Sequence, residues 1–234
     1  MKYVVSLCLA LCVQPAFAEP VVVFAAASLK EPIDALAARV GDVVVSYAGS
    51  GTLARQIQQE APADVVLLAN AEWIAALPQV ADVMDFASNA LVLIGPVGAA
   101  DLTLADLPTA LGDGRLAMGY TTAVPAGVYG RQALENLDLW DAVKDRLAEV
   151  DSVRAALTLV VRGEVPFGVV YATDAQATDA VQIVARFDPT DHDPIRYVGG
   201  LVSDDPKARA FWDALRGQVG QDLLADFGYL PVNE

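Results

Sequence analysis

Residues 21–29 read VVVFAAASL, and this stretch decides the fold. Its first four residues are β-branched or aromatic with no polar residue among them, which is typical of a strand buried on both faces. Three alanines follow, and Ser28 then precedes apolar residues at helical spacing, Leu29, Ile33 and Leu36. A buried strand that leads directly into a helix predicts a sheet of parallel strands with helices on both faces.

The same alternation of short apolar runs and helical patterns continues to the end of the chain. Further strands are expected at residues 43–47, 65–68, 90–95, 116–119, 167–171, 181–185 and 196–202, after the first at 21–24. Helices are expected at residues 29–39, 52–60, 71–77, 104–111, 126–137, 152–162, 206–216 and 221–227. So many strands suit two α/β lobes better than one sheet.

We expect each lobe to hold a mostly parallel sheet flanked by helices. Lobe 1 would comprise residues 19–89 and 200–234, and lobe 2 residues 90–199, so that both ends of the mature chain lie in lobe 1. The chain would cross between the lobes near residues 88–91 and near residues 197–202. A ligand is expected in the cleft between the lobes, where strands end and helices begin.

Composition excludes a partner that is recognised by a basic surface. The chain has 234 residues, of which 30 are acidic and 15 are basic, for a formal net charge of −15. Nucleic-acid binding needs a basic face that displaces counterions, and this balance does not provide one. Hydrophobic residues make up 55% of the chain, far more than a disordered acidic segment carries. We therefore expect a folded protein that binds no nucleic acid.

Residues 1–18, MKYVVSLCLALCVQPAFA, have the pattern of a secretory signal. Lys2 precedes an apolar run too short to span a bilayer, and a small-x-small site ends at Ala18, after which cleavage is expected. The mature chain then has 216 residues, a formal charge of −16 and no cysteine, because Cys8 and Cys12 leave with the signal. No later apolar run reaches 18 residues. We therefore expect no membrane insertion of the mature chain and, in a Gram-negative cell, a periplasmic location; a buried N-terminal strand or helix is the alternative.

Two strand-to-helix corners place hydroxyl groups at helix starts. The first corner carries Ser28, and the second, YAGSGTL at residues 47–53, carries Ser50 between two glycines. Backbone N–H groups in the first turn of a helix have no partner within it and lie at its positive end, so such a corner can hold an anion. The alternative is that Ser28, Ser50 or Thr52 only caps its own helix. Two such corners in one lobe favour the anion site.

Three further regions resemble these corners in their chemistry. Residues 123–129 open a helix after an expected strand, and Ala126 leaves its backbone N–H accessible there. Residues 151–154 form the first turn of the next helix, with Asp151 as the expected N-cap. Tyr171 ends an expected strand, and the alternative is that it is only a half-buried aromatic residue.

An enzyme is the weaker interpretation. The chain has one histidine, His192, in a turn-rich segment, and the glycines around Ser50 are not spaced as in a nucleophile elbow. Residues 188–193 could bind a cation, but a solvated acidic loop is the favoured interpretation. A zinc site would need a second histidine or a cysteine in the mature chain. We expect no catalytic residues and no cofactor.

At these corners the sequence resembles the periplasmic molybdate-binding proteins of molybdate ABC importers, over nearly all of the mature chain. The most specific stretches are VFAAASL at residues 23–29, TLARQI at 52–57, APADV at 61–65, VPAG at 124–127, DSVRAAL at 151–157 and GVVY at 168–171. Their order and spacing agree together, which is more specific than any one motif.

The resemblance implies a two-lobe periplasmic-binding-protein fold that holds a dehydrated tetrahedral dianion by neutral donors alone. The implied donors are the hydroxyls and amides of Ser28 and Ser50, the amides of Ala126 and Val153, and the hydroxyl of Tyr171. Molybdenum would be present only as the bound oxyanion. Glycines flank Ser50 where the family often has serines, which removes secondary hydroxyls.

The resemblance also implies a monomer that binds molybdate, and tungstate as well, and delivers it to the membrane permease of an importer. Two alternatives stay open. One is a binding protein for another oxyanion, such as sulfate or thiosulfate. The other is a periplasmic sensor domain without a transport role.

Overall fold

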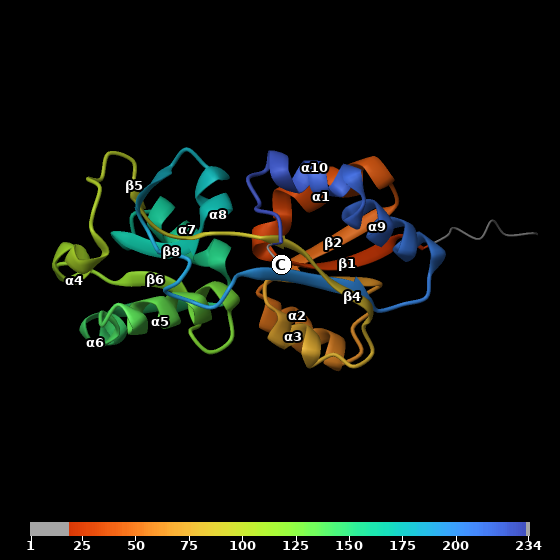
Figure 1. Ribbon diagram of the computed structural model, residues 1–234, viewed down its shortest axis with the longest axis horizontal. Helices are drawn as coiled ribbons and strands as arrows, with labels where there is room; N and C mark the ends of the chain where they lie inside the picture. The colour runs from red at the N-terminus through yellow and green to blue at the C-terminus, as the bar shows by residue number, and fades with distance from the viewer. Residues whose placement is uncertain (1–18, 233–234) are drawn as a thin grey trace, which may run out of the picture.

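The computed structural model describes residues 19–232. The predicted signal at residues 1–18, with its cleavage site at Ala18, lies outside the described residues. The described chain forms two lobes that lie side by side, each built on a five-stranded sheet with helices around it (Figure 1). The predicted two-lobe α/β fold is therefore confirmed.

Each sheet takes its strands from one lobe. The first sheet holds β1 (Val21–Ala26), β2 (Val43–Ala48), β3 (Val65–Leu68), β4 (Ala81–Ser88) and β10 (Arg196–Leu201). The second holds β5 (Leu91–Pro96), β6 (Leu116–Gly119), β7 (Leu147–Val150), β8 (Phe167–Tyr171) and β9 (Val181–Arg186). The strand order is β2-β1-β3-β10-β4 in the first sheet and β7-β6-β8-β5-β9 in the second. The two lobes thus share one plan.

Helices cover both faces of the first sheet, with α1, α9 and α10 on one face and α2 and α3 on the other (Figure 1). The first lobe contains η1 (Ala27–Leu29), α1 (Lys30–Val40), α2 (Ser50–Gln58), α3 (Ala71–Ala75), α9 (Pro206–Arg216) and α10 (Gln218–Asp226). The second lobe contains η2 (Leu104–Asp106), α4 (Leu107–Ala110), α5 (Pro125–Asn136), α6 (Trp140–Val143), η3 (Lys144–Arg146), α7 (Val153–Val161) and α8 (Ala172–Gln176). None of the helices within residues 19–232 is both long and apolar enough to cross a bilayer.

The sheets are mixed: in each, four strands run in one direction and one strand, β10 or β5, runs against them, so the expectation of mostly parallel sheets is confirmed. Strand β1 pairs in parallel with β2 and β3, and β6 does so with β7 and β8. Strand β10 is antiparallel to β3 and β4, and β5 is antiparallel to β8 and β9. Strands β5 and β10 are the first to follow each crossing between lobes. A helical crossover makes neighbouring strands parallel, whereas a strand that arrives from the other lobe is free of that constraint.

The chain passes between the sheets twice, from β4 to β5 and from β9 to β10. The expected lobe boundary between residues 199 and 200 falls inside β10, which pairs with β3 and β4 of the first sheet. Residues 196–199 therefore lie in the first lobe, and the return crossing precedes Arg196. At the outgoing crossing, Ser88 exchanges two backbone hydrogen bonds with Leu230, so the C-terminal segment packs beside it.

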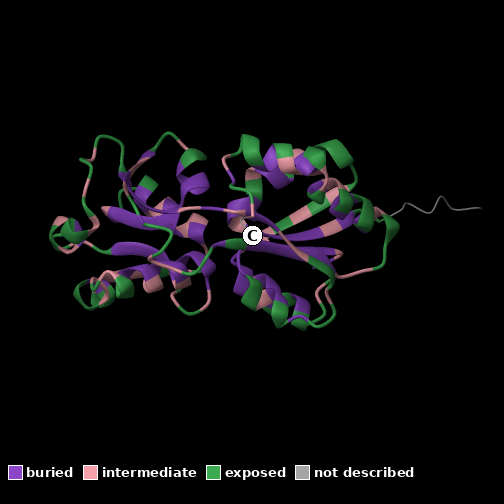
Figure 2. Cartoon of the chain, viewed as in Figure 1, coloured by how far each residue is buried: buried purple, intermediate pink, exposed green. Residues whose placement is uncertain are grey.

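Burial explains which strands the apolar pattern reveals. The inner strands β1, β3, β5 and β8 are almost wholly buried, and they fill the centre of each lobe (Figure 2). Two strands that the pattern misses, β4 and β7, lie at the sheet edges and include exposed or acidic residues. An edge strand needs no continuous apolar run, because one side of it faces solvent.

Candidate functional site

A small cavity lies between the lobes, where strands of both sheets end. It is lined by Ala26, Ala27, Ser28, Ala48, Gly49, Ser50 and Ala69 of the first lobe and by Val124, Pro125, Ala126, Val153 and Tyr171 of the second. All five predicted site residues belong to this lining. The cavity has a volume of about 10 Å³, whereas pockets for organic ligands hold roughly 300–1,000 Å³. A ligand of few atoms is therefore the kind that fits.

Ser28 is placed by the turn from β1 into η1, and its side chain is buried. Its Oγ accepts a hydrogen bond of 3.0 Å from the hydroxyl of Tyr197, and the Tyr229 hydroxyl donates to its carbonyl oxygen. Because the Ser28 oxygen is already an acceptor, its own proton remains available for donation. The alternative that Ser28 caps a helix is wrong, because no side-chain capping bond is present at η1 or α1.

Ser50 is the first residue of α2 and is equally buried. Its Oγ accepts a hydrogen bond of 3.0 Å from the backbone N–H of Ala69, which leaves the Ser50 proton free to donate. The N-cap position of α2 belongs to Gly49, and no side chain caps this helix. The capping alternative for Ser50 and Thr52 is therefore wrong as well.

Tyr171 ends β8, and its side chain is 1% exposed. Within residues 19–232, its hydroxyl is buried and has no hydrogen-bond partner. Burial, with a smaller contribution from the neighbouring Tyr197, raises the pKa of the Tyr171 hydroxyl well above its ordinary value, so this group stays a neutral donor. The alternative that Tyr171 is only a half-buried aromatic residue does not explain this unpartnered hydroxyl, because a buried hydroxyl normally has a hydrogen-bond partner.

Two helices of the second lobe begin at the cavity. Helix α5 starts at Pro125, which places the backbone N–H of Ala126 in the first turn. Helix α7 starts at Val153 and is capped by Ser152, whose Oγ accepts from the N–H of Ala155, so the expectation that Asp151 is the N-cap is wrong. First-turn N–H groups have no acceptor within their own helix, and the positive end of the helix dipole favours an anion beside them.

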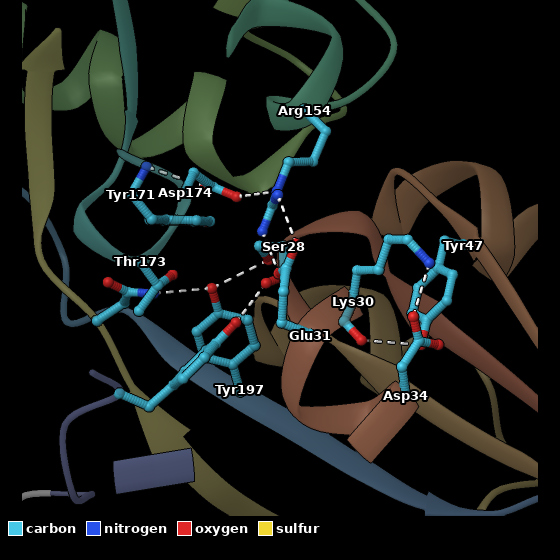
Figure 3. A network of polar contacts seen from close by, with 12 residues as sticks. Ser28, Lys30, Glu31, Asp34, Tyr47, Arg154, Tyr171, Thr173, Asp174 and Tyr197 are labelled. Carbon is cyan, nitrogen blue, oxygen red and sulfur yellow. Dashed lines mark hydrogen bonds and ion pairs between the residues drawn. The ribbon is translucent and has the colours of Figure 1, made fainter. Parts of the chain in front are cut away.

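The cavity wall carries no charged side chain within the described residues. Two cations, Lys30 and Arg154, line a neighbouring hollow that shares Ala27, Ala48 and Gly49 with the cavity. Both are already paired with carboxylates: Lys30 Nζ lies 2.7 Å from Asp34, and Arg154 contacts two acidic residues (Figure 3). The site thus offers neutral donors and helix ends, and among residues 19–232 its wall contributes neither a cation nor a carboxylate.

The two glycines beside Ser50 allow the lobes to approach closely. A Cβ atom on Gly49 would collide with the backbone carbonyl oxygen of Asp151 in the second lobe. On Gly51 it would lie 2.7 Å from the ring of Trp73 and 2.8 Å from the carbonyl oxygen of Ala123. The Trp73 indole N–H also donates across the cleft to that oxygen, at 3.1 Å. The two glycines therefore permit the lobes to close, and they also stand where the family often has serines.

The structure does not bring His192 and Ser50 together, as the enzymatic alternative would require. His192 lines a hollow beside Ser88 and Arg196, and it is absent from the lining of the cavity that contains Ser50. Its Nδ1 lies 2.7 Å from the carbonyl oxygen of Asp193. In the acidic segment, the Asp188 carboxylate accepts from the backbone and hydroxyl of Thr190, and no cluster of three metal-ligating residues occurs within residues 19–232.

Sequence reasoning missed the residues that support the donors. Ala69, which orients Ser50, follows β3 at a strand-to-helix corner like those that carry Ser28 and Ser50. That corner could have been recognised, because strand-end corners of parallel strands meet at one edge of a sheet. Tyr197 and Asn89, which are joined by a 3.2 Å hydrogen bond beneath Ser28, come from distant segments and leave no local signal.

The chain matches one family model and several known molybdate-binding proteins. Residues 21–230 match the sequence model of a family described as bacterial extracellular solute-binding protein. The chain is 37% identical over 226 residues to the molybdate-binding protein ModA of Haemophilus influenzae, covering 89% of each chain. It is 36% identical over 226 residues to the ModA protein of Escherichia coli K12, covering 89% of this chain and 88% of that one.

A solved structure also shares the fold. The periplasmic molybdate-binding protein of Azotobacter vinelandii superposes with a TM-score of 0.80 at 22% identity, over 91% of this chain and 100% of that chain. At this identity the likeness concerns the two-lobe architecture alone.

Proposed function

The chain belongs to the family of bacterial extracellular solute-binding proteins, and on that premise we propose that it binds molybdate and delivers it to an ABC importer. The ligand sits in the small interlobe cavity as an intact oxyanion. Its contacts are the hydroxyls of Ser28, Ser50 and Tyr171 and the backbone N–H groups of Ser28, Ser50, Ala126 and Val153.

One observation carries the proposal: three buried hydroxyls surround one small uncharged cavity, and each has a proton to give. The oxygens of Ser28 and Ser50 already accept hydrogen bonds, and the Tyr171 hydroxyl has no partner among residues 19–232. A fully deprotonated oxyanion has only acceptors, so it satisfies such a set of donors. A hydrogen bond to a charged group contributes ~1.5–3 kcal/mol net. Five to seven of them reach on the order of 10 kcal/mol before the cost of closure, which corresponds to micromolar to nanomolar affinity.

The same donors discriminate against protonated oxyanions. A phosphate that carries an O–H needs an acceptor in the wall, and a buried O–H without one costs ~1–3 kcal/mol. Tungstate, sulfate and thiosulfate lack that proton, so only size and the shape of the cavity separate them from molybdate. We propose that tungstate, the dianion of the same shape, is also bound.

We further propose that the protein acts in the periplasm as a monomer and is not an enzyme. The predicted signal at residues 1–18 supports export, and the resemblance to the binding proteins of molybdate ABC importers supports a permease as partner. Among residues 19–232, the cavity wall offers serine hydroxyls with no base beside them to activate a nucleophile. A sensor role without transport differs from this proposal in having no permease partner.

Thermal unfolding in the presence of different oxyanions tests the proposed function. The protein, purified from the periplasmic fraction, is melted with molybdate, tungstate, sulfate or phosphate in turn. A ligand at a thousandfold its Kd adds roughly 4 kcal/mol, which for a chain of this size raises Tm by roughly 10 °C. We expect that rise with molybdate and tungstate and little change with phosphate. A rise with sulfate alone would assign the protein to another oxyanion, and no rise with any of them would refute the proposal.

A further inference from the structure

We propose that Arg154 and Glu31 form a latch, a salt bridge across the cleft that holds the lobes closed and slows ligand release. This inference rests on the proposed function and adds two residues that lie outside the cavity lining. The two side chains belong to different lobes, since Glu31 lies in α1 and Arg154 in α7.

The geometry of the latch is bidentate. Arg154 Nη1 donates to Glu31 Oε1 at 3.0 Å, and Nη2 donates to Glu31 Oε2 at 2.5 Å (Figure 3). Two parallel bonds between a guanidinium and a carboxylate fix both distance and orientation. Such a pair forms only when the lobes have approached to one particular separation.

Arg154 is held ready for this contact from within its own lobe. Its Nε donates at 2.5 Å to Asp174, whose side chain is fully buried. The other carboxylate oxygen of Asp174 accepts from the backbone N–H of Tyr171 at 3.2 Å. The guanidinium is therefore oriented before closure, which lowers the entropy that the latch must lose when it forms.

No other salt bridge among residues 19–232 joins the two lobes. The remaining ion pairs each connect groups of one lobe. The latch side chains are 21% and 34% exposed, which places the bridge between a solvated surface pair and a buried one. An oriented, partly buried pair contributes more than a surface pair.

In the sequence, each latch residue lies close to a proposed ligand donor of its own lobe. Arg154 directly follows Val153, and Glu31 lies three residues after Ser28. A ligand that draws these two corners together also brings the latch residues into contact. Closure and ligand retention are thereby coupled, and the latch acts as a positioning device without touching the ligand.

Glu31→Gln tests the latch, because electrostatics and the latch predict opposite results. The variant removes a negative charge close to an anion, so if Glu31 acted only through its charge, molybdate would bind more tightly. If Glu31 is the latch, molybdate dissociates faster, by about 5- to 30-fold, while the association rate changes little. Stopped-flow mixing measures both rates, and circular dichroism with a thermal melt checks that the variant is folded.

Glu135→Gln is the matched control. It removes the same charge and an ion pair of 2.8 Å with Arg131, but that pair lies within α5 of one lobe. We expect its dissociation rate to match the wild type. A dissociation rate in Glu31→Gln that is unchanged or slower than wild type overturns the latch alone. A wild-type protein that binds none of molybdate, tungstate or sulfate overturns the proposed function instead.

Discussion

The hydroxyl of Tyr171 is buried without a partner among residues 19–232, in a fold that satisfies most of its other buried polar groups. A buried donor without an acceptor costs ~1–3 kcal/mol. A protein gains nothing from such a group unless a ligand supplies the acceptor. At the scale of single residues, this is the clearest sign that the cavity is built for an anion.

Tyr171→Phe should therefore separate binding from stability. The variant loses one donor to a charged ligand, so we expect molybdate affinity to fall about 10- to 150-fold. The unliganded protein should melt at the same temperature or higher, because the unpartnered hydroxyl is gone while the ring keeps its contact with Tyr197. Titration calorimetry and thermal unfolding measure the two quantities. Unchanged affinity would remove Tyr171 from the site.

Asp174 gives a prediction for pH. Burial raises its pKa from 3.8 to about 6, although the neighbouring Arg154 opposes this shift. Between those two values the folded protein keeps a proton that the unfolded chain has lost, so the contribution of this group to stability falls as pH rises from about 4 to about 6.

Comparison with Asp174→Asn isolates this effect from the other acids. The free energy of unfolding of the wild type minus that of the variant should fall by up to about 3 kcal/mol between pH 4 and pH 6.5. Urea denaturation at several pH values measures the difference. A difference that stays constant or rises with pH would contradict the raised pKa.

At the scale of secondary-structure elements, the start of α2 both donates to the cavity and meets the opposite lobe. Gly49 has φ −65° and ψ 143°, a conformation that alanine adopts without strain. The added methyl group would collide only when Asp151 of the second lobe comes close. Gly49→Ala should therefore leave the fold of the first lobe intact while it obstructs closure.

We expect Gly49→Ala to weaken molybdate binding at least tenfold. The decrease in the radius of gyration when ligand is added should be smaller than in the wild type. Calorimetry and small-angle scattering measure these quantities.

Gly98→Ala is a suitable control, because a Cβ there meets no atom within 4 Å and Gly98 does not line the cavity. Its positive φ of 85° costs some stability, so the control should melt lower yet bind normally. Normal binding by Gly49→Ala would show that the closed approach at this corner is not needed.

The sequence was informative where a local pattern has one physical explanation. Apolar runs identify the buried inner strands, and the predicted helix at residues 206–216 coincides with α9, where Pro206 and a capping Asp205 mark the start. The edge strand β7, which reads LAEV, lacks such a pattern. Strand direction also escapes local reasoning, because β5 and β10 take theirs from the crossings between lobes.

For the site, the strand-end corners pointed to Ser28 and Ser50, and the resemblance to molybdate-binding proteins implied the full set of five residues, all of which line one cavity. The contacts that prepare those residues were not predictable, because they join distant segments. The bond from Tyr197 to Ser28 spans 169 positions, and the bridge from Arg154 to Glu31 spans 123. That these five residues contact the ligand remains a prediction.

At the scale of the whole molecule, the proposed function requires an acidic protein to capture an anion. The predicted mature chain carries a formal charge of −16, so long-range repulsion opposes encounter and is screened beyond about 8 Å at physiological salt. A basic surface is not required, because hydrogen-bond donors and helix ends supply the attraction to the anion at short range, inside the cleft.

This charge balance predicts the salt dependence of capture. The association rate of molybdate should rise a few-fold as ionic strength increases from about 10 mM to about 150 mM, since salt screens like charges. Stopped-flow fluorescence over a salt series measures it. A rate that falls steeply with salt would instead indicate attraction by a cationic surface.

Calorimetric titration of the exported protein with molybdate tests the central claim most directly. The account predicts one molybdate per chain with a Kd below about 1 μM, and loss of that binding in the double variant Ser28→Ala with Ser50→Ala. Absence of heat for the wild type, a Kd in the millimolar range, or unchanged affinity in the double variant would contradict it.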